Sequence, residues 1–228
     1  MNFLDWFYPP ACMGCRTLLP LSDKRRCAVW LCTECEALIE PSEGGLQAHA
    51  ARYPKTVHFT QNDSAFAYDG ILRDIIRDVK FRNKKNHARA LGRLWADILK
   101  KRISFTDVTL VPVPLHPKKE RGRGFNQAEI LARELSKGLN LPVQNTLIRV
   151  TDTLPQAGLP PAQRIENVAD AFRIAPRYNI RGKSYIMVDD IFTTGASLNE
   201  CARTLLDGGA REVACLTLSV SLKKEDGV

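Results

Sequence analysis

The feature that most restricts the fold is an apolar run that leads into two adjacent carboxylates and a hydroxyl-rich turn. Residues 185–188 are apolar, Asp189 and Asp190 follow, and a Thr-Thr-Gly turn over 193–195 opens a helical pattern that continues to about residue 206. A short apolar run bounded in this way predicts a buried strand. In a mostly parallel sheet, ligands bind beyond the carboxyl ends of the strands, so this turn is the first candidate for a functional site.

Helical and strand patterns alternate along most of the chain. Apolar residues recur at helical spacing over 71–79 and 91–99, and an apolar run over 108–113 predicts a strand that ends at prolines. Asn126 is a candidate N-cap for a further helix, and residues 212–220 are the last predicted strand. Strands that alternate with helices predict an α/β fold with a mostly parallel sheet flanked by helices.

Positive charge is concentrated in the middle of the chain. Residues 61–140 hold 17 lysines and arginines against nine aspartates and glutamates, which accounts for the whole formal net charge of +8. Such an excess attracts the phosphates of nucleotides or nucleic acid, although a solvated basic surface has the same composition. The chain has no transmembrane segment, because no apolar run approaches the ~20 residues that span a bilayer. Its first residues lack an export signal, so we expect a cytoplasmic protein.

Five of the seven cysteines fall within the first 35 residues, and four of them form two Cys-x2-Cys pairs. Cys12 and Cys15 make the first pair, and Cys32 and Cys35 make the second. This spacing is typical of a zinc site with four thiolates. Because a segment this short cannot bury enough apolar surface to fold alone, the zinc is predicted to be structural. A redox-active or metal-free cluster is the alternative, and Cys27 is left over.

These patterns divide the chain into three parts. Residues 1–42 form a zinc-ribbon-like module, residues 43–64 a turn-rich linker and residues 65–228 the main domain. Cys201 and Cys215 lie in apolar surroundings of the main domain and are predicted to be core residues.

The residues after the two aspartates suit a sugar phosphate. Backbone N–H groups at a helix N-terminus can surround a phosphate, hydroxyls add donors, and Gly195 permits close approach of the ligand. The carboxylates can accept hydrogen bonds from ribose hydroxyls, directly or beside a hydrated Mg²⁺. The candidate binding residues are Asp189, Asp190, Thr193, Thr194, Gly195, Ala196 and Ser197. A helix cap followed by a plain turn is the structural alternative.

Residues 186–197 resemble the phosphoribosyl-pyrophosphate (PRPP) loop of type I phosphoribosyltransferases. Further segments resemble the ComF/GntX family, namely Val113–Pro117, Arg123–Gln127, Lys80-Phe81, Gln156 and the pattern Arg164-x2-Asn167-Val168-x3-Phe172. The resemblance covers nearly the whole chain. Some relatives carry additional Cys-x2-Cys pairs, whereas this chain has two, so a second zinc site is not expected.

The resemblance implies a type I phosphoribosyltransferase-like sheet behind a small zinc-ribbon module. It also implies PRPP or nucleotide binding at Asp189–Ser197, in a protein of natural transformation or DNA utilisation that assists the entry of single-stranded DNA into the cytoplasm. A separate translocase or helicase would work with it, because the chain has no P-loop. Two alternatives stay open: an active phosphoribosyltransferase of nucleotide salvage, and a non-enzymatic zinc-containing adaptor that binds DNA.

Type I phosphoribosyl transfer displaces pyrophosphate from the ribose, and the protein mainly positions the reactants and stabilises charge. The resemblance implies that Mg²⁺ and cationic side chains neutralise the pyrophosphate. The residues expected beside it are Pro114, Leu115 and the basic run over 118–124, and the catalytic candidates are Arg121 and Arg123 of that run with Asp189 and Asp190. Glycines within residues 118–124 predict a mobile closing loop, with a solvated surface loop as the alternative.

A second basic cluster surrounds the end of the predicted helix over 71–79. Three of its cations lie at i, i+4 and i+7, so they share one helical face, and an aromatic side chain beside them can stack on a base. The candidate nucleic-acid residues are Arg73, Arg77, Lys80, Phe81, Arg82, Lys84 and Lys85. Asp74 and Asp78 interrupt the cluster, and the alternative is that Phe81 belongs to the core.

Overall fold

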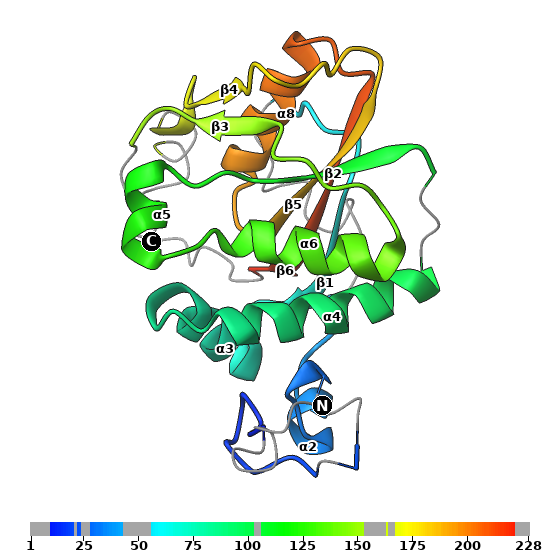
Figure 1. The fold of residues 1–228 in the computed structure, drawn as a ribbon, viewed down its shortest axis with the longest axis vertical. Helices are drawn as coiled ribbons and strands as arrows, with labels where there is room; N and C mark the ends of the chain where they lie inside the picture. The colour runs from blue at the N-terminus through cyan, green and yellow to red at the C-terminus, as the bar shows by residue number, and fades with distance from the viewer. Residues whose placement is uncertain are drawn as a thin grey trace, which may run out of the picture.

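The computed structural model describes residues 10–20, 22–23, 28–42, 56–102, 106–152, 163 and 167–221. It contains a four-stranded sheet with the order β1-β6-β5-β2, in which every pair is parallel, and a separate antiparallel pair, β3-β4 (Figure 1). The strands are β1 (Asn62–Ala67), β2 (Val108–Pro112), β3 (Leu147–Arg149), β4 (Phe172–Ile174), β5 (Ser184–Phe192) and β6 (Glu212–Val220). The helices are α2 (Thr33–Ala37), α3 (Gly70–Phe81), α4 (Lys85–Arg102), α5 (Pro117–Arg123), α6 (Gln127–Leu139) and α8 (Ala196–Asp207).

The parallel sheet separates two hydrophobic cores. Ile186 and Val188 of β5 belong to the core that includes buried residues of α3, α4 and α6, whereas Tyr185 and Met187 belong to the core beneath α8. This division follows from the alternation of side chains along a strand, with both faces of the sheet covered. The α/β fold and the mostly parallel sheet predicted from the sequence are therefore confirmed.

The N-terminal cysteine module packs on the outer side of α3 and α4 (Figure 1). Cys12, Leu31 and Cys35 belong to the same core cluster as Leu72 and Trp95 of the main domain. Residues 40–42 also pair with the edge of β1, because the N–H of residue 67 donates to the carbonyl of residue 40 at 2.9 Å and the N–H of residue 42 donates to that of residue 65 at 3.0 Å. The module is thus part of one continuous core. β1 begins at residue 62, inside the range 43–64 that the sequence analysis assigned to a linker.

Residues 118–124 form a helix rather than the mobile loop that their glycines predicted. The side chain of His116 caps α5 by accepting a hydrogen bond from the backbone N–H of Lys118, and Pro117 occupies the first turn. Gly124 ends the helix with a φ of 79°, a left-handed conformation that glycine adopts without strain. The prediction was wrong because Gly124 acts as a helix stop, so that this segment is held by caps at both ends.

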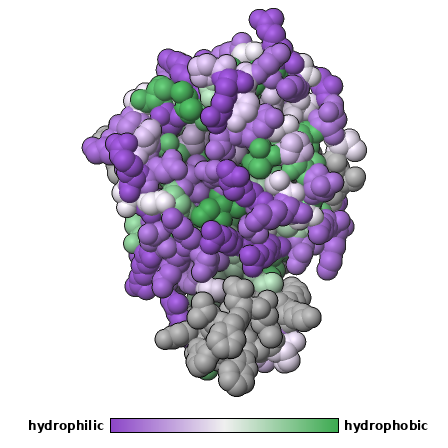
Figure 2. All heavy atoms as spheres, in the orientation of Figure 1, coloured by the Kyte–Doolittle hydropathy of each residue, from purple (hydrophilic) through white to green (hydrophobic). Residues whose placement is uncertain are grey.

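The surface has an ordinary composition for a folded domain. On the face seen in Figure 2 the described residues are mostly hydrophilic, and the hydrophobic ones form small separate groups. Among the described residues, no helix combines the length and the apolar character that a bilayer crossing requires.

Candidate sugar-phosphate site

The carboxyl end of β2 lies next to the aspartates of β5. Pro112 pairs with Val188 in the sheet, and the backbone N–H of Val113 donates to the carbonyl of Val188 at 3.0 Å. Residues 113–115 therefore leave the sheet beside the two aspartates. A cavity of about 240 Å³ adjoins residues 113–115, and its lining includes Pro114, Leu115 and Arg149.

Asp189 and Asp190 lie within β5, which continues to Phe192, further than the apolar run of the sequence predicted. Because side chains alternate along a strand, the two carboxylates point to opposite faces of the sheet. Asp190 is 5% exposed and borders a small void on the α3 and α6 side, whereas Asp189 is partly exposed. The backbone N–H of Asp190 donates to Oδ1 of Asp189 at 2.8 Å, which fixes the orientation of that carboxylate.

Lys80 forms the direct ion pair of this site. Its Nζ, at the end of α3, lies 3.0 Å from Oδ2 of Asp190, and both side chains are largely buried. The sequence analysis counted Lys80 among the nucleic-acid residues because it shares a helical face with Arg73 and Arg77. In the folded chain its ammonium group faces the interior site instead.

Two arginines lie near the carboxylates, and a lysine lies near the arginines. Arg123 interacts electrostatically with Asp190 and Asp189, and Arg149 interacts with Asp189. Lys119 lies close enough to Arg149 and Arg123 for their charges to affect it. Burial lowers the pKa of all three groups, and neighbouring cations lower that of Lys119 further. The site thus gathers an excess of positive charge, which suits a ligand with several phosphates.

The charge of Asp190 affects the ionisation of Asp189. Burial, and secondly the charge of Asp190, raises the pKa of Asp189 to about 7, while Lys80 and Arg149 oppose this shift. A cation bound beside the Asp189 oxygens would favour the ionised form of this carboxyl group. Carboxylate oxygens are also the ligands that Mg²⁺ prefers, so this donor set fits a magnesium ion bound together with a phosphate ligand.

The Thr-Thr-Gly turn follows β5 and leads into α8. Gly195 is the N-cap residue of α8 with a φ of 70°, and a Cβ there would lie 2.8 Å from Cζ of Phe192. The turn therefore requires glycine for both its backbone conformation and its close packing. Thr194 Oγ1 accepts a hydrogen bond of 3.4 Å from the N–H of Ala196. Residues 193–197 therefore include the N-terminus of α8, which is twelve residues long. This arrangement fits an anion at the helix N-terminus.

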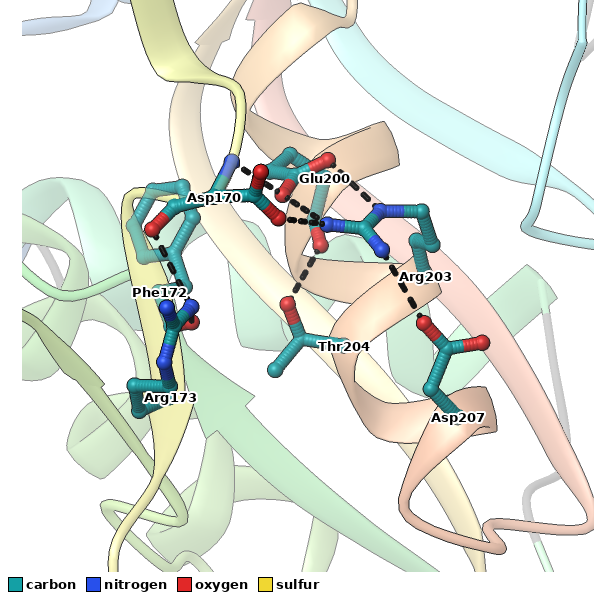
Figure 3. Close-up of polar contacts among 7 residues, drawn as sticks. All are labelled: Asp170, Phe172, Arg173, Glu200, Arg203, Thr204 and Asp207. Atoms are coloured by element: carbon teal, nitrogen blue, oxygen red, sulfur yellow. Dashed lines mark hydrogen bonds and ion pairs between the residues drawn. The ribbon is translucent and has the colours of Figure 1, made fainter.

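An ion-pair network anchors α8 to the segment before β4 (Figure 3). Arg203 pairs with Glu200 at 2.6 Å, with Asp170 at 2.7 Å and with Asp207 at 3.1 Å. The backbone N–H of Asp170 also donates to Glu200 at 2.8 Å. This network was not predicted, although the spacing of Glu200, Arg203 and Asp207 is visible in the sequence. Asp170 is 33 residues away from Arg203 and has no local signal.

The remaining predicted site residues take different positions in the folded chain. Arg123 is half-buried, faces the carboxylates and donates to the side chain of Gln127, whereas Arg121 is exposed. Asn126 is the N-cap of α6, and its amide group donates to the carbonyl of Val113 at 2.9 Å. Lys119 belongs to the basic run over 118–124 that the sequence predicted, and it lies near Arg123 and Arg149. Arg149 was not predicted, because only the folded chain brings it to Asp189. Gln156, Arg164 and Cys27 lie outside the described residues.

The four predicted cysteines form a cluster with the geometry of a metal site. Their sulfur atoms all lie within 4.8 Å of one another, and Sγ of Cys15 is 3.7 Å from Sγ of Cys32. A zinc ion bound by four thiolates at about 2.3 Å needs sulfur atoms at such separations. Hydrogen bonding with Thr17 lowers the pKa of Cys15 to about 6, which favours the thiolate form that binds metals. The residues therefore fit zinc.

A cleft lies between the cysteine module and α3. Its volume is about 490 Å³, and its lining includes Arg16, Arg77, Phe81 and Arg82. Phe81 is 77% exposed, so it is not the core residue that the alternative interpretation required. Of the remaining nucleic-acid candidates, Arg73 pairs with Asp69 and Asp74, Lys84 is exposed, and Lys85 lies over the ring of Phe125 at 5.4 Å.

Comparisons with known proteins agree with this geometry. The family described as phosphoribosyl transferase domain matches residues 80–226. The chain is 33% identical to competence protein F of Haemophilus influenzae over 148 residues, which cover 62% of this chain and 65% of that protein, just under two thirds.

Two other relatives match over most of their length. Competence protein ComFC of Bacillus subtilis is 27% identical over 216 residues, which cover 91% of this chain and 82% of that protein. DNA utilization protein YhgH of Salmonella typhi is 30% identical over 226 residues, which cover 90% and 94% of the two chains. With the parallel sheet, the aspartate pair and the cysteine cluster, these matches make the chain a member of the ComF family with a phosphoribosyl transferase domain.

Proposed function

We propose that this protein binds PRPP, or a closely related sugar phosphate, together with Mg²⁺ at residues 189–197. The observation that carries the proposal is the meeting of two adjacent carboxylates of β5, three cations that interact with them and the N-terminus of α8. In this assignment residues 193–197 hold the 5′-phosphate, and Asp189 and Asp190 accept hydrogen bonds from ribose hydroxyls. Lys119, Arg123 and Arg149 hold the pyrophosphate.

A magnesium ion held beside the aspartates would supply positive charge to the ligand. When bound with the ligand, Mg²⁺ neutralises part of the pyrophosphate charge. The cationic side chains orient that group, and the carboxylates fix the ribose, so the chain's own residues provide the positioning that phosphoribosyl transfer needs. In the broader setting, the names of the relatives support a role in competence or DNA utilisation.

Single-stranded DNA is the proposed nucleic-acid ligand, and the cleft between the cysteine module and α3 is its proposed site. Exposed Phe81 offers a ring for base stacking, and Arg77 offers charge to the backbone. Arg16 and Arg82 also line the cleft, where both pair with Asp78, so the lining holds three arginines against two aspartates and the excess charge is positive. A separate translocase would supply the energy of DNA movement. The zinc ion of the cysteine module has a structural role in this proposal, because four thiolates leave no coordination position open.

Isothermal titration calorimetry with PRPP and Mg²⁺ tests the sugar-phosphate site. We expect wild-type protein to bind, and the Asp189→Asn/Asp190→Asn variant to lose at least about tenfold in affinity. Asp107→Asn, a change at a carboxylate with 91% exposure, is the matched control and should bind as wild type does. Pyrophosphate release in the presence of a panel of nucleobases separates transfer from binding alone. Failure of the wild-type protein to bind PRPP would refute the proposal.

A further inference from the structure

Helix α3 stands between the cysteine module and the twin aspartates. Its last two turns carry ion pairs that point in different directions: Asp78 pairs with Arg16 of the module at 3.0 Å, and Lys80 pairs with Asp190 at 3.0 Å. Asp78 and Lys80 are thus two residues apart on the same helix. Any change in the position of this end of α3 therefore affects both ion pairs.

The module side of this connection is closely packed. Gly14, inside the first Cys-x2-Cys turn, lies so near α3 that a Cβ would overlap the side chain of Ile71 and would lie 2.9 Å from Sγ of Cys35. Arg16 follows Cys15 with a φ of 68°, and its N–H donates to the carbonyl of Cys12 at 3.0 Å. The conformation of the cysteine turn thus determines the position of the Arg16 backbone and how closely α3 packs against the module.

The ligand side includes a direct ion pair of α3 with the aspartates. Two neighbouring carboxylates repel each other, and Lys80 supplies an ammonium group directly at Asp190. Because the N–H of Asp190 holds Oδ1 of Asp189 at 2.8 Å, the arrangement of one aspartate affects the other. Displacing Lys80 would remove the direct ion-pair partner of a carboxylate whose side chain is only 7% exposed.

We propose that Lys80 is a positioning residue of the sugar-phosphate site and that α3 couples metal loading of the cysteine module to ligand binding at the twin aspartates. This inference rests on the proposed function. Metal in the module holds the cysteine turn, the turn holds Arg16 against Asp78, and α3 then presents Lys80 to Asp190. By thermodynamic reciprocity, a bound sugar phosphate also strengthens metal retention by the module.

Calorimetry with PRPP and Mg²⁺ on the full zinc-loaded chain tests the role of Lys80. We expect Lys80→Met to weaken binding at least about tenfold and Lys80→Arg to restore most of it, because arginine keeps the charge. Lys137→Met is the matched control, since Lys137 also pairs with a largely buried carboxylate, Glu134, at 2.7 Å, but on α6. Lys137→Met should leave PRPP affinity unchanged. If folded Lys80→Met also binds PRPP with wild-type affinity, the proposal is overturned.

The coupling is tested by comparing zinc-loaded with metal-depleted chain and with Arg16→Ala. We expect PRPP affinity to fall about fivefold or more in both, with no additional loss on depletion in the Lys80→Met background. Circular dichroism monitors folding. If metal depletion unfolds the chain, the coupling is tested instead by the PRPP affinity of zinc-loaded Arg16→Ala and by hydrogen exchange over residues 70–81. The coupling is overturned if the folded, metal-depleted chain binds PRPP as tightly as the zinc-loaded chain. It is also overturned if Arg16→Ala keeps the wild-type PRPP affinity and the wild-type hydrogen exchange over residues 70–81. A wild-type chain that binds no PRPP refutes the proposed function itself.

Discussion

Asp189 and Asp190 have different surroundings although they are adjacent in the chain. Asp190 has an ammonium partner in Lys80, whereas burial and the neighbouring charge raise the pKa of Asp189 to about 7. The ordinary value for aspartate is about 3.9, so folding favours the protonated form of Asp189 between these two values. A ligand that brings a cation or sugar hydroxyls to this carboxylate then favours its ionised form.

This shift predicts a pH dependence of stability. Between about pH 4 and pH 7 the folded chain retains a proton that the unfolded chain loses, so the contribution of Asp189 to stability falls as pH rises and is level above pH 7. Urea unfolding of the ligand-free protein at pH 5, 6, 7 and 8 measures it. Relative to Asp189→Asn, we expect a decrease on the order of 1 kcal/mol per pH unit below pH 7. Parallel pH profiles of the two proteins would contradict this assignment.

Gly195 and Gly182 provide a matched pair of substitutions, since both have a φ of 70°. A Cβ at Gly182 meets no atom within 4 Å, whereas one at Gly195 lies 2.8 Å from Phe192. We expect Gly182→Ala to lower the free energy of unfolding by about 1 kcal/mol and Gly195→Ala to lower it by about 2–4 kcal/mol. Gly195→Ala should also lose PRPP affinity, and equal effects of the two substitutions on unfolding would show that packing against Phe192 is unimportant.

At the scale of elements, α5 and α8 show what local sequence can predict. The N-terminus of α8 and the Asn126 cap of α6 were predicted correctly, because a cap residue and the helix that it starts are neighbours in the chain. The stop signal of α5 at Gly124 was also present. It was interpreted as mobility because the same segment contains Gly122 and four cations, and propensity alone does not decide between a short capped helix and a loop.

The Arg203 network fixes the helix whose N-terminus forms the phosphate turn. Arg203 has three carboxylate partners, and Asp170 ties the segment before β4 to α8. Because the Arg203 side chain is 34% exposed, we expect Arg203→Met to lower the free energy of unfolding by about 1–2 kcal/mol. Arg133→Met, which removes one exposed pair with Glu129, is the control and should cost at most about 0.5 kcal/mol in urea unfolding. Equal losses would mean that the network adds nothing beyond a surface ion pair.

At the scale of the whole molecule, the candidate site combines residues that are distant in sequence. The turn over 193–197 and the cysteine spacing were visible locally. In contrast, Lys80 and Arg149 reach the aspartates only because α3 and β3 end near the carboxyl edge of β5. Helical periodicity grouped Lys80 with the exposed cations of α3, since periodicity identifies a face but does not show what that face packs against.

The position of α3 also separates two binding surfaces, which leads to the last prediction. Phe81, Arg77 and Arg82 line the cleft on the module side, while Lys80 faces the aspartates. Fluorescence anisotropy with a labelled oligo(dT) measures binding to the first surface. We expect Phe81→Ala to weaken binding by about 5- to 100-fold because base stacking is removed, without a change in unfolding, because its side chain is exposed.

Substitution of the cleft arginines should act differently from removal of the ring. Arg77→Ala/Arg82→Ala removes charge, so we expect weaker binding and a smaller slope of log affinity against log salt, by about 0.7 for each phosphate that the protein no longer neutralises. Exposed Lys183, at the opposite end of β5, provides the control, and Lys183→Ala should change neither quantity measurably. PRPP affinity should stay unchanged in Phe81→Ala, because the ring and Lys80 face different sites. Unaltered oligo(dT) binding in both cleft variants would place the nucleic acid elsewhere on the molecule.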